Sequence, residues 1–302
     1  MDIGIIGLGR MGGNMAARLV ERGHRVVGHD RSADAMTRAA GDGVETAAST
    51  GALIAALTSP RVVWMMVPAG APVDAAIEDL LPSLSRGDVI VDGGNSWYRD
   101  SIRRAEALAA KGIGFIDAGV SGGIWGRAEG YSLMIGGTPD DVARLTPICE
   151  ALAPAADRGW GHVGPPGAGH FVKMVHNGIE YGMMQAFAEG FAIMKAKEPL
   201  ALDLAQVAGI WQHGSVVRSW LLDLAARALS RDEALAAVAP WVDDSGEGRW
   251  TVQEAIDLNT PAPIITHSLI ARLESRDKEG FTYRMLAALR NEFGGHAIKK
   301  DA

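Results

Sequence analysis

Short apolar runs alternate with amphipathic stretches along the first half of the chain. Each run is rich in β-branched residues or short, and each is bounded by Gly, Pro or Asp, which is typical of buried strands. Strands are predicted at Asp2–Ile6, Arg25–His29, Val62–Val67, Val89–Asp92, Gly114–Ala118, Ser132–Ile135 and Gly161–Val163. Helical periodicity separates them, as in 11–22, so the pattern predicts an α/β fold with a doubly wound parallel sheet.

The pattern changes after residue 164. Gly164-Pro165-Pro166-Gly167 interrupts the chain, and a long helix is predicted to begin near Ala168. No strand-like alternation of comparable quality follows. We therefore expect two domains, an α/β domain over residues 1–164 and an all-α domain over residues 165–302.

A glycine-rich loop joins the first predicted strand to the first predicted helix. Gly7-Leu8-Gly9-Arg10-Met11-Gly12 has the spacing G-x-G-x-x-G. Gly7 would permit a tight turn, Gly9 the approach of a pyrophosphate, and Gly12 close packing of helix on strand. The helix N-terminus would then face the phosphates. The first domain is therefore predicted to be a Rossmann-like dinucleotide-binding domain.

An acidic residue follows the second predicted strand. Asp30 lies 18 residues beyond Gly12, near the usual position of the carboxylate that binds the ribose of NAD. This carboxylate would repel a 2′-phosphate, which favours NAD. Arg31 and Ser32 could hold that phosphate if Asp30 turned aside, so NADP stays possible.

Three further segments follow strands whose carboxyl ends should meet at one edge of the sheet. Val67-Pro68, Gly93-Gly94-Asn95-Ser96 and Ser121-Gly122-Gly123 are expected to cluster there, where such sheets bind ligands. Val67 and Asn95 are assigned to the cofactor, and Asn95 also offers polar groups beside a nicotinamide.

The long predicted helix carries a polar stripe. Lys173, His176, Asn177 and Glu180 recur at i, i+3, i+4 and i+7 and therefore share one face. A solvated helix face is the ordinary explanation of such a stripe. The other faces are apolar, however, so we expect a helix buried nearly all round, with a polar stripe that needs partners or a ligand. The apolar residues are Phe171, Met174, Val175, Ile179, Met183 and Met184.

Composition narrows the class of protein. The 302 residues are 48% hydrophobic and 22% charged, as in a globular protein, and the net charge of −7 disfavours nucleic acid as a partner. The single cysteine, Cys149, excludes an internal disulfide and fits the cytoplasm. We expect no metal site, no export signal and no membrane span.

The chain resembles the 6-phosphogluconate dehydrogenases, in their shorter bacterial form. The motifs are GLGRMGGNM, VDGGNS, GVSGG, SLMIGG and GAGHFVKMVHNGIEYGMMQ. The first is shared across the β-hydroxyacid dehydrogenases, and the last is much narrower. The resemblance implies oxidative decarboxylation of 6-phospho-D-gluconate to D-ribulose 5-phosphate and CO₂, with reduction of NAD(P)⁺ and without a metal.

The resemblance also implies residue roles. Lys173 would take the proton from the C3 hydroxyl and then donate to the 3-keto oxygen, and Glu180 would protonate C1 in the last step. His176 and Asn177 would orient the carboxylate and hydroxyls of the sugar acid. Further substrate contacts would come from Asn95, Ser121, Gly122 and Gly123.

The phosphate of the substrate would be bound by residues of the helical domain. The resemblance nominates Tyr181, Arg272, Arg290 and His296. In longer members of the family, the C-terminal arginine and histidine reach the partner subunit's site, which implies a homodimer or homotetramer whose helical domain both binds substrate and dimerises.

The sequence departs from the family pattern at three places. Ser245 replaces a phosphate-binding lysine, so nearby Arg249 is a candidate substitute. Ile124-Trp125 replaces two glutamates, which puts the details of that loop in doubt. Asp30-Arg31-Ser32 replaces the frequent Asn-Arg-Thr, which again favours NAD.

Two other functions fit part of this pattern. A 3-hydroxyisobutyrate-type dehydrogenase would share the glycine loop, Ser121-Gly122-Gly123, a lysine and an asparagine, but would need neither Glu180 nor a phosphate site. A binding module that senses the nucleotide without turnover would need neither Lys173 nor Glu180. The presence of both residues favours the decarboxylating enzyme.

Overall fold

The computed structural model describes residues 1–294 and 297–299 and divides into two compact units. The first unit is Met1–Asn177, and the second begins at Gly178. The first unit therefore continues beyond the boundary expected at residue 164, because the helix that begins at Ala168 starts within it. His296, a predicted substrate residue, lies outside the described residues.

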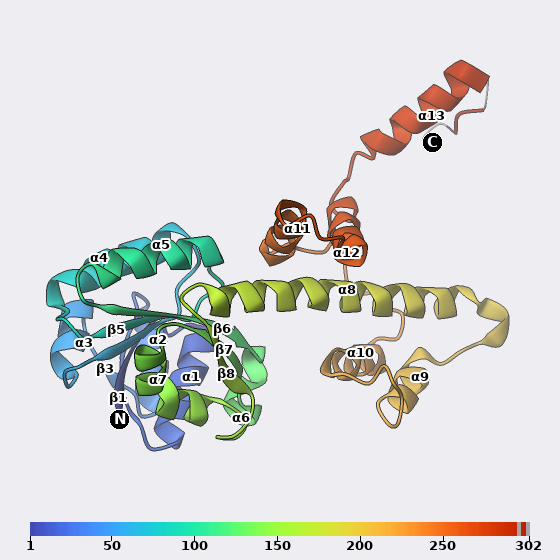
Figure 1. The fold of residues 1–302 in the computed structure, drawn as a ribbon. Helices are drawn as coiled ribbons and strands as arrows, with labels where there is room; N and C mark the ends of the chain where they lie inside the picture. Colours follow the sequence, from blue (N-terminus) through green and yellow to red (C-terminus); the bar gives the residue numbers. More distant parts are fainter. Residues whose placement is uncertain (295–296, 300–302) are drawn as a thin grey trace. The chain divides into compact units, whose positions relative to one another are not determined.

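The first unit is built on an eight-stranded sheet of order β3-β2-β1-β4-β5-β6-β7-β8 (Figure 1). Strands β1 to β6 pair in parallel, which confirms the predicted α/β fold. The two-residue β3 was too short to leave a pattern in the sequence. The strands are β1 (Asp2–Ile6), β2 (Arg25–His29), β3 (Glu45–Thr46), β4 (Val62–Met65), β5 (Val89–Asp92), β6 (Gly114–Ser121), β7 (Ser132–Gly136) and β8 (Trp160–Gly164).

The far edge of the sheet is not wholly parallel. Strand β7 runs antiparallel to β6, and β8 is parallel to β7. The connection from β6 to β7 spans residues 122–131 and holds only η2 (Gly123–Trp125) and α6 (Gly126–Glu129). A parallel crossover needs about a dozen residues or more, so this shorter link returns the chain in the opposite direction.

Helices cover both faces of the sheet (Figure 1). Helices α1, α2 and α7 pack with one apolar cluster of the sheet, and α3, α4 and α5 pack with the other. These helices are α1 (Arg10–Glu21), α2 (Ala33–Gly41), α3 (Thr50–Ala56), α4 (Ala71–Leu80), α5 (Tyr98–Ala109) and α7 (Pro139–Leu152), with η1 (Leu81–Ser83) after α4. The strands are therefore buried on both sides, as their continuous apolar runs predicted.

Within the described residues, every regular element of the second unit is a helix, as predicted. Helix α8 (Ala168–Ala196) continues into it from the first unit. The other elements are η3 (Glu198–Leu200), α9 (Leu204–Trp211), α10 (Trp220–Arg231), α11 (Glu247–Asp257), α12 (Pro263–Glu274) and α13 (Phe281–Gly294). Leu204, Ala208 and Leu222 anchor an apolar cluster of this unit. Within the described part of the chain, no helix combines the length and apolar character needed to cross a bilayer.

Cys149 offers a direct test of the packing of the first unit. It lies in α7 with no exposed surface, and burial raises the pKa of its thiol to about 12. Because the thiolate is the reactive form, we expect the native protein at about pH 8 to leave an aromatic disulfide reagent unreacted. Protein unfolded in guanidinium should release one equivalent of the chromophore. Rapid stoichiometric labelling of the native protein would contradict this packing.

Candidate active site

The start of α8 is fixed by a carboxylate from the sheet. Asp117 lies within β6 and is fully buried. Its Oδ1 accepts a hydrogen bond from the Gly167 N–H at 2.6 Å, and its Oδ2 accepts one from the His170 N–H at 2.7 Å. Asp117 thus satisfies N–H groups that a helix start leaves without intrahelical partners. A carboxylate at this end of a helix also complements the helix dipole.

Glycines allow α8 to lie directly on the strands. A Cβ at Gly169 would lie 2.3 Å from the Asp117 carbonyl oxygen, and one at Gly136 would lie 2.6 Å from the Gly169 nitrogen. A Cβ at Gly119 would lie 2.5 Å from the Cβ of Lys173. No larger residue fits at these contacts without displacing the helix. The glycines therefore set the distance between the sheet and Lys173.

Three residues of the predicted polar stripe meet at one amide oxygen. The buried Lys173 donates from Nζ to Oδ1 of Asn177, which is also buried. Nδ1 of His176 lies 3.1 Å from the same oxygen. Glu180 follows one turn later on α8 and is half-buried. The stripe is therefore organised by its own hydrogen bonds and is not an ordinary solvated face.

The expectation that α8 is buried nearly all round is wrong. Ile179 is 53% exposed and Met183 is 38% exposed, whereas Met174 is buried. Both exposed residues follow Asn177, where α8 leaves the first unit. Gly178, the residue before Ile179, is buried and lies so close to α11 that a Cβ there would be 2.6 Å from Cγ2 of Thr251.

The glycine loop has the geometry that its spacing predicted. Gly7 has a φ of +90°, and a Cβ there would lie 2.4 Å from the Met66 carbonyl oxygen. A Cβ at Gly12 would lie 1.9 Å from the Gly7 oxygen, whereas one at Gly9 would meet nothing within 4 Å. Gly9 is the N-cap of α1, and no side chain caps that helix. The loop thus fits a diphosphate group, which could approach Gly9 and the free helix end.

Asp30 faces this loop. Its Oδ2 accepts a hydrogen bond from the Leu8 N–H at 2.6 Å, and its Oδ1 accepts one from the Ser32 N–H at 2.7 Å. The carboxylate is therefore not turned aside. The Ser32 hydroxyl caps α2 by accepting a hydrogen bond from Ala35, and Arg31 is exposed. Of the other loop residues, Arg10 is exposed and Met11 is half-buried.

The loops after β4, β5 and β6 lie at one edge because these strands are adjacent and parallel. A Cβ at Gly94 would lie 2.8 Å from the Val67 carbonyl oxygen, so the first two loops are in contact. Val67 is half-buried and Asn95 is exposed. After the third strand, Ser121 is half-buried, and Gly122 and Gly123 adopt φ values of +126° and +52°. The predicted clustering of these segments is thus present for Val67 and Gly94.

The substituted pair after Gly123 is exposed. Ile124 and Trp125 are 52% and 38% exposed. The carbonyl of Ile124 accepts a hydrogen bond from Nδ2 of Asn14, at 3.3 Å, which joins this loop to α1. An apolar pair therefore occupies the position that the family pattern gives to two carboxylates.

The second unit brings together another set of predicted residues. The hydroxyl of Tyr181 lies 3.1 Å from Oγ of Ser245, and the guanidinium of Arg272 lies 3.6 Å from the centre of the Tyr181 ring. Arg272 also donates from Nη1 to the carbonyl of Asp243 at 2.9 Å. Oγ of Ser245 donates to Glu247 at 2.5 Å. The serine that replaces the family's lysine thus contacts the predicted phosphate-binding tyrosine.

The remaining predicted cations are placed differently. Arg249 forms an ion pair with the buried carboxylate of Asp244. Arg290 lies on α13 and is exposed. In the part of the chain that the structure describes, no group of three or more His, Cys, Asp or Glu side chains could hold a metal ion.

Sequence reasoning missed Asp117, although a signal for it existed. A carboxylate in the middle of the apolar run FIDAGV can be buried only with partners that satisfy it. Its partners are Gly167 and His170, and the nearer of them is 50 residues away in the chain. Their identity was therefore not accessible without the fold.

Two family models together cover most of the chain. Residues 2–162 match the NAD binding domain of 6-phosphogluconate dehydrogenase, and residues 169–300 match the 6-phosphogluconate dehydrogenase C-terminal domain. The chain belongs to the 6-phosphogluconate dehydrogenase family. The family assignment confirms the resemblance drawn from the sequence motifs.

Curated relatives include proteins of two lengths. The NAD(+)-dependent, decarboxylating 6-phosphogluconate dehydrogenase of Haloferax volcanii is 45% identical over 303 aligned residues. The alignment covers 100% of this chain and 100% of that enzyme. The NADP(+)-dependent, decarboxylating enzyme of Bacillus subtilis is 40% identical over 292 residues, which are 92% of this chain and 62% of that enzyme. Relatives named for each nucleotide therefore occur.

Solved structures show the same relationship. The Plasmodium falciparum 6-phosphogluconate dehydrogenase superposes with a TM-score of 0.84 at 31% identity, covering 100% of this chain and 66% of that one. The 3-hydroxyisobutyrate dehydrogenase of Mycobacterium tuberculosis gives a TM-score of 0.73 at 24% identity, with 91% of this chain and 94% of that chain covered. The second likeness shows a shared fold alone.

Removal of the buried acceptor that starts α8 should destabilise the protein. We expect Asp117→Ala to lower the free energy of unfolding by about 3 kcal/mol, because two buried N–H groups lose their partner. Urea unfolding followed by circular dichroism would measure this change. Asp157→Ala is the control, because Asp157 is exposed and, among the described residues, pairs only with its neighbour Arg158. This substitution should change stability by less than about 0.5 kcal/mol. Equal effects of the two substitutions would contradict the capping role.

Proposed function

We propose that this protein catalyses the oxidative decarboxylation of 6-phospho-D-gluconate to D-ribulose 5-phosphate and CO₂, with reduction of NAD(P)⁺. The observation that carries the proposal is the stripe on α8, where a buried lysine is held by Asn177 and a glutamate follows seven residues after the lysine. Family membership and the names of the relatives support it. The chemistry needs no metal, because acid and base side chains can move both protons.

Lys173 is proposed as the base of the first step and the acid of the second. It takes the proton of the C3 hydroxyl as hydride leaves C3, and NAD(P)⁺ held at the glycine loop would supply the hydride acceptor. Lys173 then returns its proton to the C3 oxygen as the bond to the carboxylate breaks and its electron pair forms an enediol. The hydrogen bond to the Asn177 oxygen would hold Nζ of Lys173 in one position during both proton transfers.

Glu180 is proposed as the acid of the last step, in which the enediol carbon that becomes C1 of the product is protonated. Seven residues of helix separate Cα atoms by about 10 Å along the axis, so the long side chains of Lys173 and Glu180 can converge on neighbouring carbons of one sugar acid. His176 and Asn177 lie between them and would orient the carboxylate and hydroxyls. Asn95, Ser121, Gly122 and Gly123 would complete these contacts from the loops of the sheet.

NAD is proposed as the preferred nucleotide. The carboxylate of Asp30 faces the glycine loop through its hydrogen bond with Leu8, in the orientation suited to a ribose with two free hydroxyls. The Ser32 hydroxyl accepts a hydrogen bond from Ala35 and keeps its own hydrogen, so Arg31 and Ser32 are the nearby groups for a 2′-phosphate. Gly7 to Gly12 and Val67 are proposed to hold the rest of the dinucleotide.

Arg272 and Tyr181 are proposed to bind the phosphate of the substrate. Their stacking presents a guanidinium and a hydroxyl together. Arg249 is a weaker candidate because Asp244 already neutralises it. Arg290 and His296 would supply further positive charge or hydrogen bonds.

The reaction and its acid–base roles can be tested in one assay. We expect wild type to reduce NAD⁺ with 6-phosphogluconate, measured at 340 nm, with a lower rate for NADP⁺ at equal concentration. Lys173→Met and Glu180→Gln should each lower kcat by about 10²–10⁴-fold, since each removes a positioned proton-transfer group.

Glu189→Gln supplies the matched control for this assay. Glu189 is an exposed glutamate of the same helix and accepts a hydrogen bond from Gln185, so its rate should stay within about twofold of wild type. Oxidation of an unphosphorylated 3-hydroxy acid that survives Glu180→Gln, without turnover of 6-phosphogluconate, would refute the decarboxylase and favour a simple dehydrogenase.

A homo-oligomer, at least a homodimer, is proposed in which the C-terminal helix completes a neighbouring site. Helix α13 exposes Phe281, Tyr283, Met285, Leu286 and Leu289. Such a helix is apolar over much of its surface and would gain stability by packing on a second copy of the chain. Its Arg290 would then serve the partner's substrate.

The single buried cysteine supports a place in the reducing cytoplasm.

Subunit mixing tests this arrangement. Lys173→Met and Arg290→Leu chains should each have little activity alone. In a heterodimer, one of the two sites would combine an intact Lys173 with an intact Arg290 from the partner. Random pairing of co-expressed chains makes about half of the dimers heterodimers, so about a quarter of wild-type activity should return. If Arg290 serves its own chain, both sites of a heterodimer stay defective and no activity returns. Separately tagged chains purified in tandem would confirm that heterodimers formed.

A further inference from the structure

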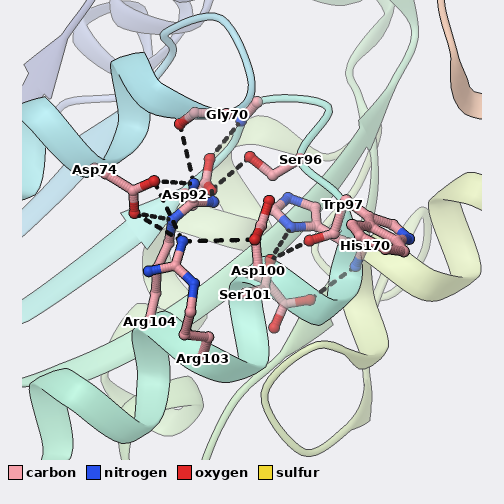
Figure 2. A network of polar contacts seen from close by, with 12 residues as sticks. Gly70, Asp74, Asp92, Ser96, Trp97, Asp100, Ser101, Arg103, Arg104 and His170 are labelled. Atoms are coloured by element: carbon pink, nitrogen blue, oxygen red, sulfur yellow. Dashed lines mark hydrogen bonds and ion pairs between the residues drawn. The ribbon is translucent and has the colours of Figure 1, made fainter.

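A buried arginine of α5 connects the two loops to which Val67 and Asn95 belong. Arg104 is 2% exposed and contacts three residues at the ends of these loops: Gly70, Asp74 in the first turn of α4, and Asp92 at the end of β5 (Figure 2). Nε and Nη2 donate to the two carboxylate oxygens of Asp74 at 2.9 and 3.1 Å, and Nη2 donates to the carbonyl of Gly70 at 3.0 Å. Nη1 lies 3.5 Å from Oδ2 of Asp92.

The contacts with Asp74 and Gly70 fix the loop that follows β4. Gly70 is the N-cap of α4, and Asp74 lies in its first turn. The bidentate hydrogen bonds from Arg104 lower the pKa of Asp74, so this carboxylate stays charged at neutral pH. The segment from Val67 to Gly70 therefore ends at a residue whose carbonyl is bound to α5.

Asp92, which Arg104 meets as an ion pair and not through a hydrogen bond, holds the loop that follows β5. Asp92 has no exposed surface, and its Oδ1 accepts a hydrogen bond from the Gly94 N–H at 3.2 Å. Its Oδ2 accepts one from the Ser96 hydroxyl at 2.7 Å. Gly94 and Ser96 are the residues on either side of Asn95. Asp92 thus holds both neighbours of Asn95 in place and leaves the Asn95 side chain exposed.

We infer that Arg104 is a positioning residue, which sets the geometry of Val67 and Asn95 toward nucleotide and substrate without touching either ligand. This role rests on the proposed function of those two residues. A buried guanidinium shared between the fully buried carboxylate of Asp92 and the carboxylate of Asp74 in α4 allows few alternative arrangements. The contact between Gly94 and the Val67 carbonyl then transmits any displacement of one loop to the other.

The adjacent Arg103 supplies a matched control. It precedes Arg104 in α5 and also donates a hydrogen bond to the carboxylate of Asp74, at 3.0 Å. Its side chain, however, is 57% exposed, and its other ion pair is with Asp100. It shares the charge and one partner of Arg104. Within the described part of the chain, its polar partners are Asp74 and Asp100, and it does not contact Asp92 or Gly70.

The experiment compares Arg104→Met, Arg104→Lys and Arg103→Met in the full-length protein. NADH affinity is measured by fluorescence, and kcat and KM are measured for NAD⁺ and 6-phosphogluconate. We expect Arg104→Met to weaken NADH binding about tenfold and to lower kcat/KM about 100-fold, because small displacements of positioning groups have effects of this size. Arg103→Met should stay within about twofold of wild type for each quantity.

Arg104→Lys separates positioning from stability. Lysine keeps the buried charge but cannot bind Asp74, Gly70 and Asp92 together, so a variant with a native circular dichroism spectrum should still lose kcat at saturating substrate. Wild-type kcat and NADH affinity in folded Arg104→Lys, or equal losses in Arg103→Met and Arg104→Met, would overturn the inference.

The NADH measurement also keeps the two proposals apart. If wild type binds NADH but does not oxidise 6-phosphogluconate, the proposed reaction fails. The difference in NADH affinity between the Arg104 and Arg103 variants would still decide whether Arg104 positions the loops.

Discussion

The hydrogen bonds from Gly167 and His170 to Asp117 are the constraint on which the first unit's candidate site depends. They start α8 at a defined point of β6, and the glycine contacts then fix how closely the helix lies on the sheet. Lys173 follows within two turns of this anchor. Its position is therefore set by the strand whose carboxyl end carries Ser121, so Lys173 and the loop that begins at Ser121 share one rigid support.

The same design recurs with charges in place of a helix cap. Asp92, at the end of β5, holds the residues on either side of Asn95, and Arg104 neutralises it from α5. In both cases a fully buried aspartate near the carboxyl edge of the sheet orders a segment that carries a proposed site residue. Buried carboxylates are costly without partners, so each of these segments has few alternative conformations that would keep the carboxylate satisfied.

Much of this arrangement followed from local sequence patterns. The strands at Asp2–Ile6, Arg25–His29 and Val89–Asp92 were predicted with their observed bounds, and the glycine loop has the predicted geometry, because both depend on neighbouring residues. Contacts between distant residues were not accessible, such as that of Asp117 with His170. The antiparallel direction of β7 was also not predicted, because it depends on the short connection from β6. The exposure of Ile179 was not predicted either, because it depends on which residues cover α8 beyond the first unit.

Because Lys173 and Glu180 lie on one unbroken helix, α8 fixes the distance and the angle between the two proposed proton-transfer groups. Each added or deleted residue between them would rotate Glu180 by about 100° around the helix axis and shift it by about 1.5 Å. Substitutions at the positions between Lys173 and Glu180 are therefore tolerated far more easily than insertions or deletions there. Length variation among related chains should accordingly fall outside this seven-residue interval.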